Sequence, residues 1–504
     1  MATLSVAAIL AENARRRPHK EALVEGDLRL TFGQVWQNAL ARAGALAGLG
    51  VRPGDRVALM APNTAEFPQA YYAIAAAGGV VVPVHLLLSA EEVEHVLTDS
   101  GSTLLLCHPA QAETGTAAAR AAGVRVVVLG EEFAKLAADA APLPSYVTRD
   151  ADDPAVVFYT SGTTGVPKGA LLSHFNLVMN ATVNAFDAND IRPEDIALGA
   201  LPLFHAFGQT VSMNSVWRAG ATLVLLPRFD AARAVELMVR EKVDTFHGVP
   251  TMFVALAAAA AGAEALPALR VCVSGGASLP VAVLERFEEA FGARIYEGYG
   301  LSETSPAAAV NQPAFGAKPG TIGHPLWGVD VEIARADVEG RVELLPPGAL
   351  GEVVVRGHNV FSGYLGRPEA TAEAMADGWF RTGDLGTKDD EGFLRIVDRK
   401  KDVIIRGGYN VYPREVEEVL ARHPGIAQVA VIGLPDDLHG EEICAVVVPA
   451  PGTEPDAAGI TEWSKEHLGR HKYPRRVEFT DALPLGPSMK VLKRELRARY
   501  TPVG

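Results

Sequence analysis

Cysteine is scarce in this sequence, and the few cysteines form no metal or redox motif. Cys107, Cys272 and Cys444 are the only three in 504 residues, and they lie far apart. This spacing argues against a disulfide framework and against a thiolate metal site. We expect all three to be buried as small apolar side chains.

The sequence also lacks a secretory signal and a membrane-spanning segment. Three arginines at 15–17 follow the short apolar N-terminal stretch, whereas a signal peptide has its basic residues in front. The most apolar stretch, residues 71–90, contains Gly78, Gly79 and Pro83, so it predicts a buried helix, a turn and a buried strand. We therefore expect a cytoplasmic protein with no integral membrane segment.

Basic residues are outnumbered by acidic ones. The chain has 46 Lys and Arg against 60 Asp and Glu, which gives a formal net charge of −14. A chain with this balance is a poor general binder of nucleic acid or of anionic membranes, although a local basic pocket can still hold a small anion. Its length and its 48% hydrophobic content predict about three domain-sized units.

Strand-like and helix-like segments alternate through the first 300 residues. A helical pattern over residues 6–17 ends at Pro18, and later segments switch between short apolar runs and runs with helical spacing. Such alternation predicts layered α/β subdomains with a largely parallel sheet. The predicted strands are residues 57–60, 79–84, 103–107, 221–226, 245–249 (turn or strand) and 269–274, and the predicted helices are residues 65–77, 90–99 and 231–241.

Two changes of pattern divide the rest of the chain. From residue 329 the strands become short and alternating, which predicts a β-rich subdomain over about 329–397. Beyond the charged stretch 398–402, a helix that begins with Pro413 and two following strands predict a compact α+β unit. We expect a large N-terminal domain over 1–397, a hinge over 398–401 and a small mobile C-terminal domain over 402–504.

The strongest chemical signal is a loop of hydroxyl residues and glycines at 159–169, directly after the apolar strand 155–158. Several backbone N–H and side-chain O–H donors on one loop predict a phosphate cradle, to which Lys168 can add a charge. The loop is not a Walker A motif, because Gly169 follows the lysine and the spacing differs. The residues predicted to contact phosphate are Thr160, Ser161, Gly162, Thr163, Thr164, Gly165 and Lys168.

This loop resembles the signature of the adenylate-forming superfamily, which includes acyl-CoA synthetases, firefly-type luciferases and the adenylation domains of peptide synthetases. Further segments resemble the superfamily in the same order, and together they cover nearly the whole chain. They are residues 201–208, 275–277, 296–304, 378–384, 398–402 and 487–490. The resemblance implies an enzyme that activates a carboxylic acid with ATP and Mg²⁺ and transfers the acyl group to CoA.

The resemblance also assigns the nucleotide and metal residues. It implies that Glu303 and Thr160 help to hold Mg²⁺, since this ion takes carboxylates together with substrate oxygens. It implies that Tyr299 stacks on adenine and that Asp384 accepts the two ribose hydroxyls. The other residues implied to bind ATP or AMP are Gly275, Gly276, Ala277, Glu297, Gly298, Gly300, Thr304 and Arg399.

Lys490 is implied to be the catalytic lysine. A fixed ammonium there would stabilise negative charge that develops as the carboxylate attacks the α-phosphorus. The residue before it is Met489 where the family usually has glycine, and Lys493 is a weaker alternative. The third catalytic candidate besides Lys490 and Glu303 is His205; a lone histidine in an apolar run is often a core residue, but the resemblance places it beside the acyl pocket.

The acyl pocket, the CoA route and the hinge follow from the same resemblance. Phe204, His205, Val249 and Gly298, with Phe207, Met252 and Phe253, predict an apolar and fairly open pocket. Enzymes for dicarboxylates have arginine at position 298, so glycine disfavours a second carboxylate. A medium- or long-chain fatty acid is the first choice and an aryl or cinnamate-like acid the second. Gly407, Gly408 and Tyr409, after Arg406, are implied to face CoA once the small domain rotates about Lys401.

Three other functions are weighed against this one. A ligase that loads a carrier protein shares the first half-reaction, but no carrier segment follows Gly504 and no long insertion is evident. A luciferase-like oxygenase also shares it, and a non-catalytic binding module would bind ATP without turnover. We expect a monomer or a homodimer.

Overall fold

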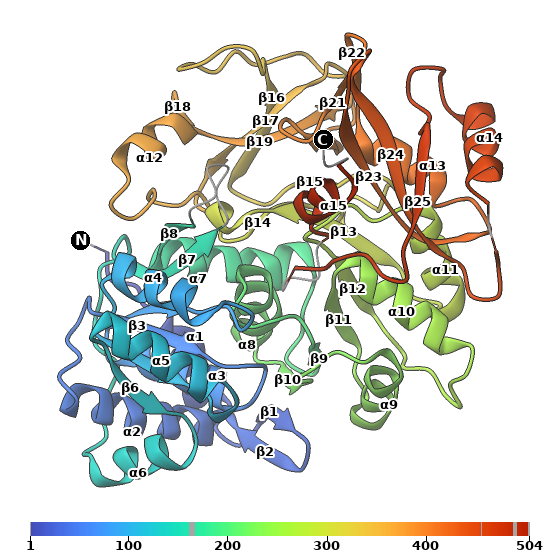
Figure 1. Ribbon diagram of the computed structural model, residues 1–504. Helices are drawn as coiled ribbons and strands as arrows, with labels where there is room; N and C mark the ends of the chain where they lie inside the picture. Colours follow the sequence, from blue (N-terminus) through green and yellow to red (C-terminus); the bar gives the residue numbers. More distant parts are fainter. Residues whose placement is uncertain (1, 161–166, 455, 487–490, 502–504) are drawn as a thin grey trace.

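The computed structural model describes residues 2–160, 167–454, 456–486 and 491–501, and it arranges them as α/β layers followed by a smaller α+β region (Figure 1). The predictions for residues 161–165 and for Lys490 concern residues outside these described ranges. The three cysteines are buried, as predicted. Among the described residues, no helix combines the length and apolar character needed to cross a bilayer.

The largest sheet has nine strands, and its centre is parallel. Its order is β15-β14-β13-β12-β11-β9-β10-β1-β2. The six strands from β13 to β1 pair in parallel, because helices connect them and cover both faces. The bounds are β1 (Glu21–Glu25), β2 (Leu28–Thr31), β9 (Ile196–Gly199), β10 (Thr222–Leu225), β11 (Thr245–Gly248), β12 (Val271–Ser274), β13 (Ile295–Gly300), β14 (Ala307–Val310) and β15 (His324–Pro325).

A second, six-stranded sheet holds the strand before the phosphate loop. Its order is β6-β5-β3-β4-β7-β8, and only β8 runs antiparallel to its neighbour. Residues 71–90 form the end of a helix, a turn and a strand, as predicted. The bounds are β3 (Arg56–Met60), β4 (Val80–Pro83), β5 (Leu104–Cys107), β6 (Arg125–Val128), β7 (Pro154–Thr160) and β8 (Lys168–Ser173).

Helices cover both sheets. On one face of the nine-stranded sheet α9, α10 and α11 build a core with Phe246 and Cys272; on the other face α7, the π-helices η2 and η3, and α8 pack between the two sheets. The predicted helix over 231–241 has those bounds. The helices are α1 (Ala7–Arg16), α2 (Phe32–Gly48), α3 (Glu66–Ala76), α4 (Ala90–Ser100), α5 (Ala112–Ala122), α6 (Glu131–Asp139), α7 (His174–Val183), η2 (Asn184–Ala188), η3 (Phe207–Asn214), α8 (Ser215–Ala219), α9 (Ala231–Glu241), α10 (Pro250–Ala260) and α11 (Val281–Phe291), with short turns η1 (Pro109–Gln111) and η4 (Ser302–Thr304).

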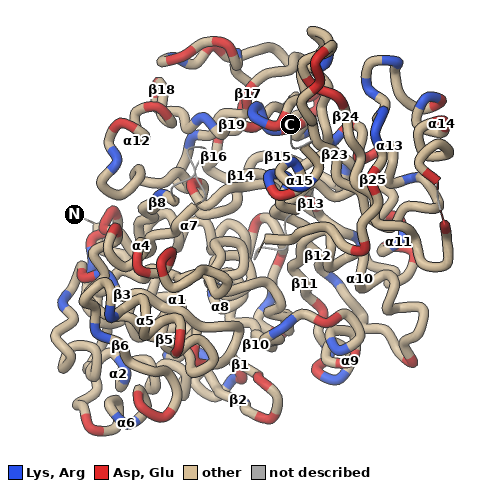
Figure 2. The backbone as a smooth tube through the Cα atoms, viewed as in Figure 1, with Lys and Arg blue, Asp and Glu red and all other residues tan. Residues whose placement is uncertain are grey.

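Two five-stranded sheets follow, and both signs of charge occur in each part of the chain (Figure 2). The first contains β16 (Val329–Ala334), β17 (Gly351–Gly357), β18 (Met375–Ala376), β19 (Trp379–Lys388) and β20 (Leu394–Arg399), with α12 (Pro368–Ala374) beside it. The second contains β21 (Ile404–Arg406), β22 (Tyr409–Val411), β23 (Ile426–Asp436), β24 (Gly440–Pro449) and β25 (Arg476–Phe479), with α13 (Pro413–Leu420), α14 (Ala457–His467) and α15 (Lys493–Tyr500). Because β20 ends at Arg399, the first two residues of the expected hinge belong to a sheet.

Candidate active site

The predicted nucleotide residues gather at the carboxyl ends of the parallel strands. β12 is followed directly by Gly275, β13 contains Glu297 to Gly300, and η4 contains Glu303 and Thr304. In open α/β sheets, ligands bind at this edge, because the loops there converge from several strands. η4 also packs against β8, so the edge of the large sheet meets the strands that flank the phosphate loop.

One corner of the site is organised around a buried carboxylate. Glu303 is 8% exposed, which excludes a solvated surface role. Its Oε1 accepts hydrogen bonds from the Tyr364 hydroxyl at 2.9 Å and from the Thr160 hydroxyl at 3.4 Å. Lys168 lies over the Tyr364 ring, with Nζ 5.5 Å from the centroid. A carboxylate and a hydroxyl this close offer the hard oxygen ligands that Mg²⁺ prefers, so the pair fits the ion that the sequence implied.

A second corner joins Asp384, which was predicted to bind ribose, to Tyr299, which was predicted to stack on adenine, and to Arg399. Asp384 is buried; its Oδ2 accepts a 2.6 Å hydrogen bond from the Tyr299 hydroxyl, and its Oδ1 lies 3.0 Å from Arg399 Nε. Burial and the neighbouring Asp384 charge raise the pKa of Tyr299 above its ordinary value. The structure thus brings together three residues that are separated by up to 100 positions, and it shows the Tyr299 hydroxyl as a hydrogen-bond donor to Asp384.

Glu297 lies beneath the predicted adenine loop. Its Oε1 accepts from the Leu279 backbone N–H at 3.0 Å, shortly after the turn at Gly275, Gly276 and Ala277. Burial raises the pKa of Glu297 to about 8. This carboxyl therefore holds the backbone that follows the loop, and burial favours its neutral form.

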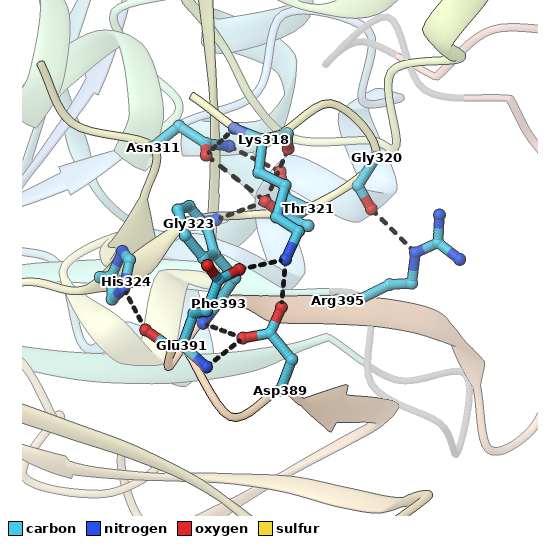
Figure 3. Close-up of polar contacts among 10 residues, drawn as sticks. All are labelled: Asn311, Lys318, Gly320, Thr321, Gly323, His324, Asp389, Glu391, Phe393 and Arg395. Carbon is cyan, nitrogen blue, oxygen red and sulfur yellow. Dashed lines mark hydrogen bonds and ion pairs between the residues drawn. The ribbon is translucent and has the colours of Figure 1, made fainter. Parts of the chain in front are cut away.

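A polar network connects β13 to the loop between β19 and β20, and Figure 3 shows the part of it from Asn311 to Asp389 and Glu391. The Asn311 N–H donates to the Glu297 carbonyl at 2.9 Å, and its Oδ1 accepts from the Lys318 N–H at 3.1 Å. Lys318 Nζ in turn lies 2.6 Å from Asp389 and 2.8 Å from Glu391, between β19 and β20 (Figure 3). The network ties the strand of the nucleotide loop to the sheet that carries Asp384. Sequence reasoning missed it, because these residues belong to no motif.

The aromatic residues predicted for the acyl pocket separate into two groups. The Phe207 ring lies against Gly275, where an added Cβ would come within 3.1 Å of it, and His205 Nδ1 accepts from the Phe207 N–H at 3.3 Å. Phe204 is nearly buried and its ring contacts His85. The pocket role of Phe253 is wrong, because its ring packs in the core against Phe246 and Phe287 on the other face of the sheet.

Val249 and Gly298, two residues predicted to line the acyl pocket, are packed more tightly than expected. Val249 is buried and precedes α10. A Cβ on Gly298 would lie 3.2 Å from Val310 Cγ2, so the pocket is not open at that point. The tightness follows from the antiparallel pairing of Gly298 with Val310.

The predicted CoA turn is exposed and lies in the small C-terminal region that begins at residue 402. Gly407 and Gly408 have φ of 55° and 82° between β21 and β22, a conformation that favours glycine. Tyr409 is 60% exposed. Arg406 is held in a two-point ion pair by Glu442, with Nε 2.6 Å from Oε1, so its guanidinium fixes the turn.

Hydrogen bonds between residues on either side of Lys401 connect the small region to the larger N-terminal part of the chain. Asp398 Oδ2 accepts from the Arg414 N–H at 3.0 Å in the first turn of α13, and Arg286 Nη2 donates to the Ala421 carbonyl at 3.5 Å. Lys401 is exposed between β20 and β21. Lys493, the alternative catalytic lysine, is paired with Glu417 at 2.7 Å.

Comparison with known proteins agrees with this geometry. Residues 10–365 match the family model described as AMP-binding enzyme, and residues 415–490 match the AMP-binding enzyme C-terminal domain. A feruloyl-CoA synthase of Amycolatopsis sp is 40% identical over 97% of both chains. A long-chain-fatty-acid–CoA ligase of Bacillus subtilis (strain 168) is 34% identical over 98% of this chain and 94% of that one.

A solved structure shows the same fold. A benzoate CoA ligase from Burkholderia xenovorans LB400 superposes with a TM-score of 0.90 at 28% identity, covering 98% of this chain and 99% of the other. The fold class predicted from sequence is thereby confirmed, and so is the resemblance. The chain belongs to the AMP-binding enzyme family, within the adenylate-forming superfamily, and is an ATP-dependent acid–thiol ligase of the acyl-CoA synthetase type.

Proposed function

We propose that this chain joins a carboxylic acid with an apolar body to CoA through an acyl-adenylate. In the first half-reaction a carboxylate oxygen of the acid attacks the α-phosphorus of ATP, and pyrophosphate leaves. In the second, the CoA thiol attacks the acyl carbonyl, and AMP leaves. The observation that carries the proposal is the meeting of the Glu303 corner and the Asp384 corner at one edge of the large sheet.

We assign the polyphosphate and the metal to the Glu303 corner. Mg²⁺ held by Glu303 and Thr160 would neutralise charge on the phosphates. Tyr364 orients the Glu303 carboxylate through its 2.9 Å hydrogen bond. Lys168 adds a positive charge on the same side. Thr304 completes the turn with its hydroxyl bonded to backbone carbonyls, so its part is to shape η4 against the phosphates.

We assign the ribose to Asp384. Two carboxylate oxygens can accept two vicinal hydroxyls, but in this structure Tyr299 and Arg399 already contact them. Each oxygen keeps a further lone pair, so the hydroxyls can bind beside these contacts or replace them, and a turn of Arg399 would carry its charge toward the phosphate side. Tyr299 and the backbone at Gly275 then border the adenine.

We assign the two half-reactions to two positions of the small region. Lys490 serves the first, and rotation about Lys401 brings Gly407, Gly408 and Tyr409 toward the thiol for the second. The rotating unit is residues 402–504, and the large domain is residues 1–397. The Asp398–Arg414 and Arg286–Ala421 hydrogen bonds would have to break, which makes them markers of the present position.

We place Phe204 and Phe207 beside the acyl pocket, whereas Val249 packs in the same core as Phe253. Two classes of acid suit such an apolar wall. One is a medium- or long-chain fatty acid, as in the name of the Bacillus subtilis relative. The other is an aryl acid, as in the names of the feruloyl-CoA synthase and the benzoate CoA ligase. Gly298 provides no cation for a second carboxylate, so a dicarboxylate is disfavoured.

The test is pyrophosphate release by the purified protein with MgATP and a panel of fatty, aryl and dicarboxylic acids, with and without CoA. We expect release with a monocarboxylic acid and stoichiometric CoA consumption. Adenylation without CoA consumption would instead support a carrier-protein acceptor. ATP binding without pyrophosphate release from any acid would overturn the proposal.

A further inference from the structure

A histidine and an aspartate lie beside the predicted CoA turn (residues 407–409), and none of the assignments above uses them. His439 is in the loop that joins β23 to β24, and its Nδ1 lies 3.0 Å from Asp436 Oδ1. The same Asp436 oxygen accepts the His439 backbone N–H at 2.7 Å and the Leu438 N–H at 3.1 Å. These bonds hold the loop and the imidazole ring in one geometry.

The Asp436 carboxylate determines which ring nitrogen of His439 carries the proton. The hydrogen bond from the His439 backbone lowers the pKa of Asp436, so the carboxylate is ionised at neutral pH. An ionised carboxylate can only accept, so Nδ1 of the ring is the donor, and in the neutral imidazole Nε2 then has a free lone pair. Nε2 has no hydrogen-bond partner among the described residues, and the side chain is 32% exposed. His439 is therefore an oriented proton acceptor that solvent and ligands can reach.

The loop that carries His439 is bonded directly to the predicted CoA turn. The Gly407 N–H donates to the His439 carbonyl at 2.8 Å, and Arg406 pairs with Gly440 between β21 and β24. A Cβ added to Gly407 would lie 3.6 Å from His439 Cδ2, so the ring is within van der Waals reach of the turn. A movement of the small region that brings residues 407–409 to the thiol therefore brings His439 as well.

The charges around His439 suit a base better than a metal ligand. Glu442 Oε2 lies 4.0 Å from His439 Nδ1, but Arg406 binds both oxygens of Glu442, at 2.6 and 2.9 Å. A cation among these side chains would be repelled by the guanidinium. The Asp436 charge instead stabilises the imidazolium that forms when Nε2 accepts a proton. The further titratable groups near this cluster, through their charge effects on Arg406 and Glu442, are Tyr473 and Arg475.

The second half-reaction requires the removal of a proton. The thiolate, not the thiol, is the nucleophile, and an ordinary thiol with a pKa of about 8.5 is mostly protonated at neutral pH. The residues assigned to this step so far, Gly407, Gly408 and Tyr409, offer no group that accepts a proton at neutral pH. A positioned base contributes about 100- to 10,000-fold to such a step.

We propose that His439 is the general base of thioester formation and that Asp436 orients it. The CoA thiol gives its proton to Nε2, and the sulfur forms a bond to the acyl carbon. The bond from that carbon to the phosphate oxygen breaks, and its electron pair leaves on AMP. The imidazolium then releases its proton to solvent. This inference rests on the proposed function, because it assigns a residue to the second half-reaction.

The test measures the two half-reactions separately in the full-length protein. Acyl-adenylate is accumulated from MgATP and the panel acid that releases most pyrophosphate, and CoA is then added in a single-turnover assay over a range of pH. In His439→Gln, acyl-adenylate formation should be unchanged, and thioester formation at neutral pH should fall by about 100-fold or more. The deficit should shrink above about pH 8.5, where the CoA thiol ionises without help.

Two further variants separate a base from a structural role. Asp436→Asn keeps an oxygen for the loop N–H groups but removes the charge, so the acidic limb of the wild-type profile should move to lower pH. His467→Gln is the matched control, because it removes a histidine of the same region that stacks on Trp463 in α14. Its profile should match the wild type.

Three results would overturn the inference. One is a His439→Gln variant with normal thermal unfolding and an unchanged rate and pH profile of thioester formation, as expected if His205 were the base; the ligase reaction would still stand. Another is a deficit of equal size at every pH, which would show a structural role. The third is a wild type that consumes no CoA. If no acid releases pyrophosphate, the proposed function fails and the inference fails with it.

Discussion

The predicted nucleotide edge (Glu303, Asp384 and their hydrogen-bond partners) and the predicted CoA turn (residues 407–409) differ in how much of their geometry exists without a ligand. At the nucleotide edge, Glu303 and Asp384 are buried and already hydrogen-bonded by Tyr364 and Tyr299. At the CoA turn, Tyr409 is 60% exposed, in a two-glycine bend. The first region is held in place by two sheets, whereas the second belongs to a small region that is joined to the rest by the chain at Lys401 and by a few hydrogen bonds.

The difference indicates how one chain can perform two half-reactions. Buried, mutually bonded polar groups hold their orientation, which favours electrostatic stabilisation of a transition state. An exposed turn on a small region can be moved without breaking a core, because only a few boundary contacts must be exchanged. Substitutions around Glu303 and Asp384 should therefore impair adenylation. Substitutions near Lys401, where the small region joins the large domain, should impair thioester formation alone.

The largest effect is expected from Lys490→Ala. Loss of a cation that stabilises transition-state charge should lower acyl-adenylate formation by about 100- to 1,000-fold or more. Thioester formation from supplied acyl-adenylate should persist, because the second step uses the other position of the small region. Single-turnover assays of each step measure this, and normal pyrophosphate release by the variant would contradict the role of Lys490.

Lys401→Pro tests whether the small region rotates about Lys401. Proline fixes φ near −65° and so restricts the rotation at the crossing point. We expect adenylation within about twofold of wild type and thioester formation reduced by roughly 100-fold, a loss of the size that misplaced catalytic groups cause. Lys400→Ala, which alters the neighbouring side chain without restricting the backbone, is the control. An equal loss in both half-reactions would reject the hinge.

Tyr364→Phe tests whether the buried corner holds a metal. Removing the hydroxyl that orients Glu303 should raise the Mg²⁺ concentration needed for half-maximal rate by about 10- to 100-fold, as for other residues that support metal ligands. Excess Mg²⁺ should restore most of the rate. A rate that drops without any change in Mg²⁺ dependence would show that Tyr364 acts on substrate instead.

The smallest effect concerns stability and pH. Because burial raises the folded-state pKa of Glu297 from 4.5 to about 8, the folded protein binds more protons than the unfolded chain between these values. Its free energy of unfolding should therefore fall as pH rises from about 5 to about 8. Glu297→Gln, which stays neutral, should flatten this decline in urea titrations. An identical pH dependence in both proteins would remove Glu297 as its cause.

Sequence patterns predicted the α/β alternation, the helix at 231–241 and the buried cysteines, because these depend on local periodicity and composition. Glu303, Asp384 and Arg399 were singled out as well, since each lies in a segment with a recognisable order of residue types; their roles stay predictions. Tyr364 and Asn311 were not found, because a lone polar residue in a strand or loop carries no periodic signal. Phe253 was assigned to the pocket because an apolar side chain next to a site has the same pattern as one in the core.

The sequence by itself determined the family, the order of the secondary structure and the residue types at the nucleotide edge. Only the tertiary structure decided which of these residues meet: Thr160 with Glu303, Tyr299 with Asp384, and Tyr364 with both the carboxylate and Lys168. The physical reason is that periodicity specifies which face of an element is buried, whereas the partner across the interface depends on how sheets far apart in the chain pack together.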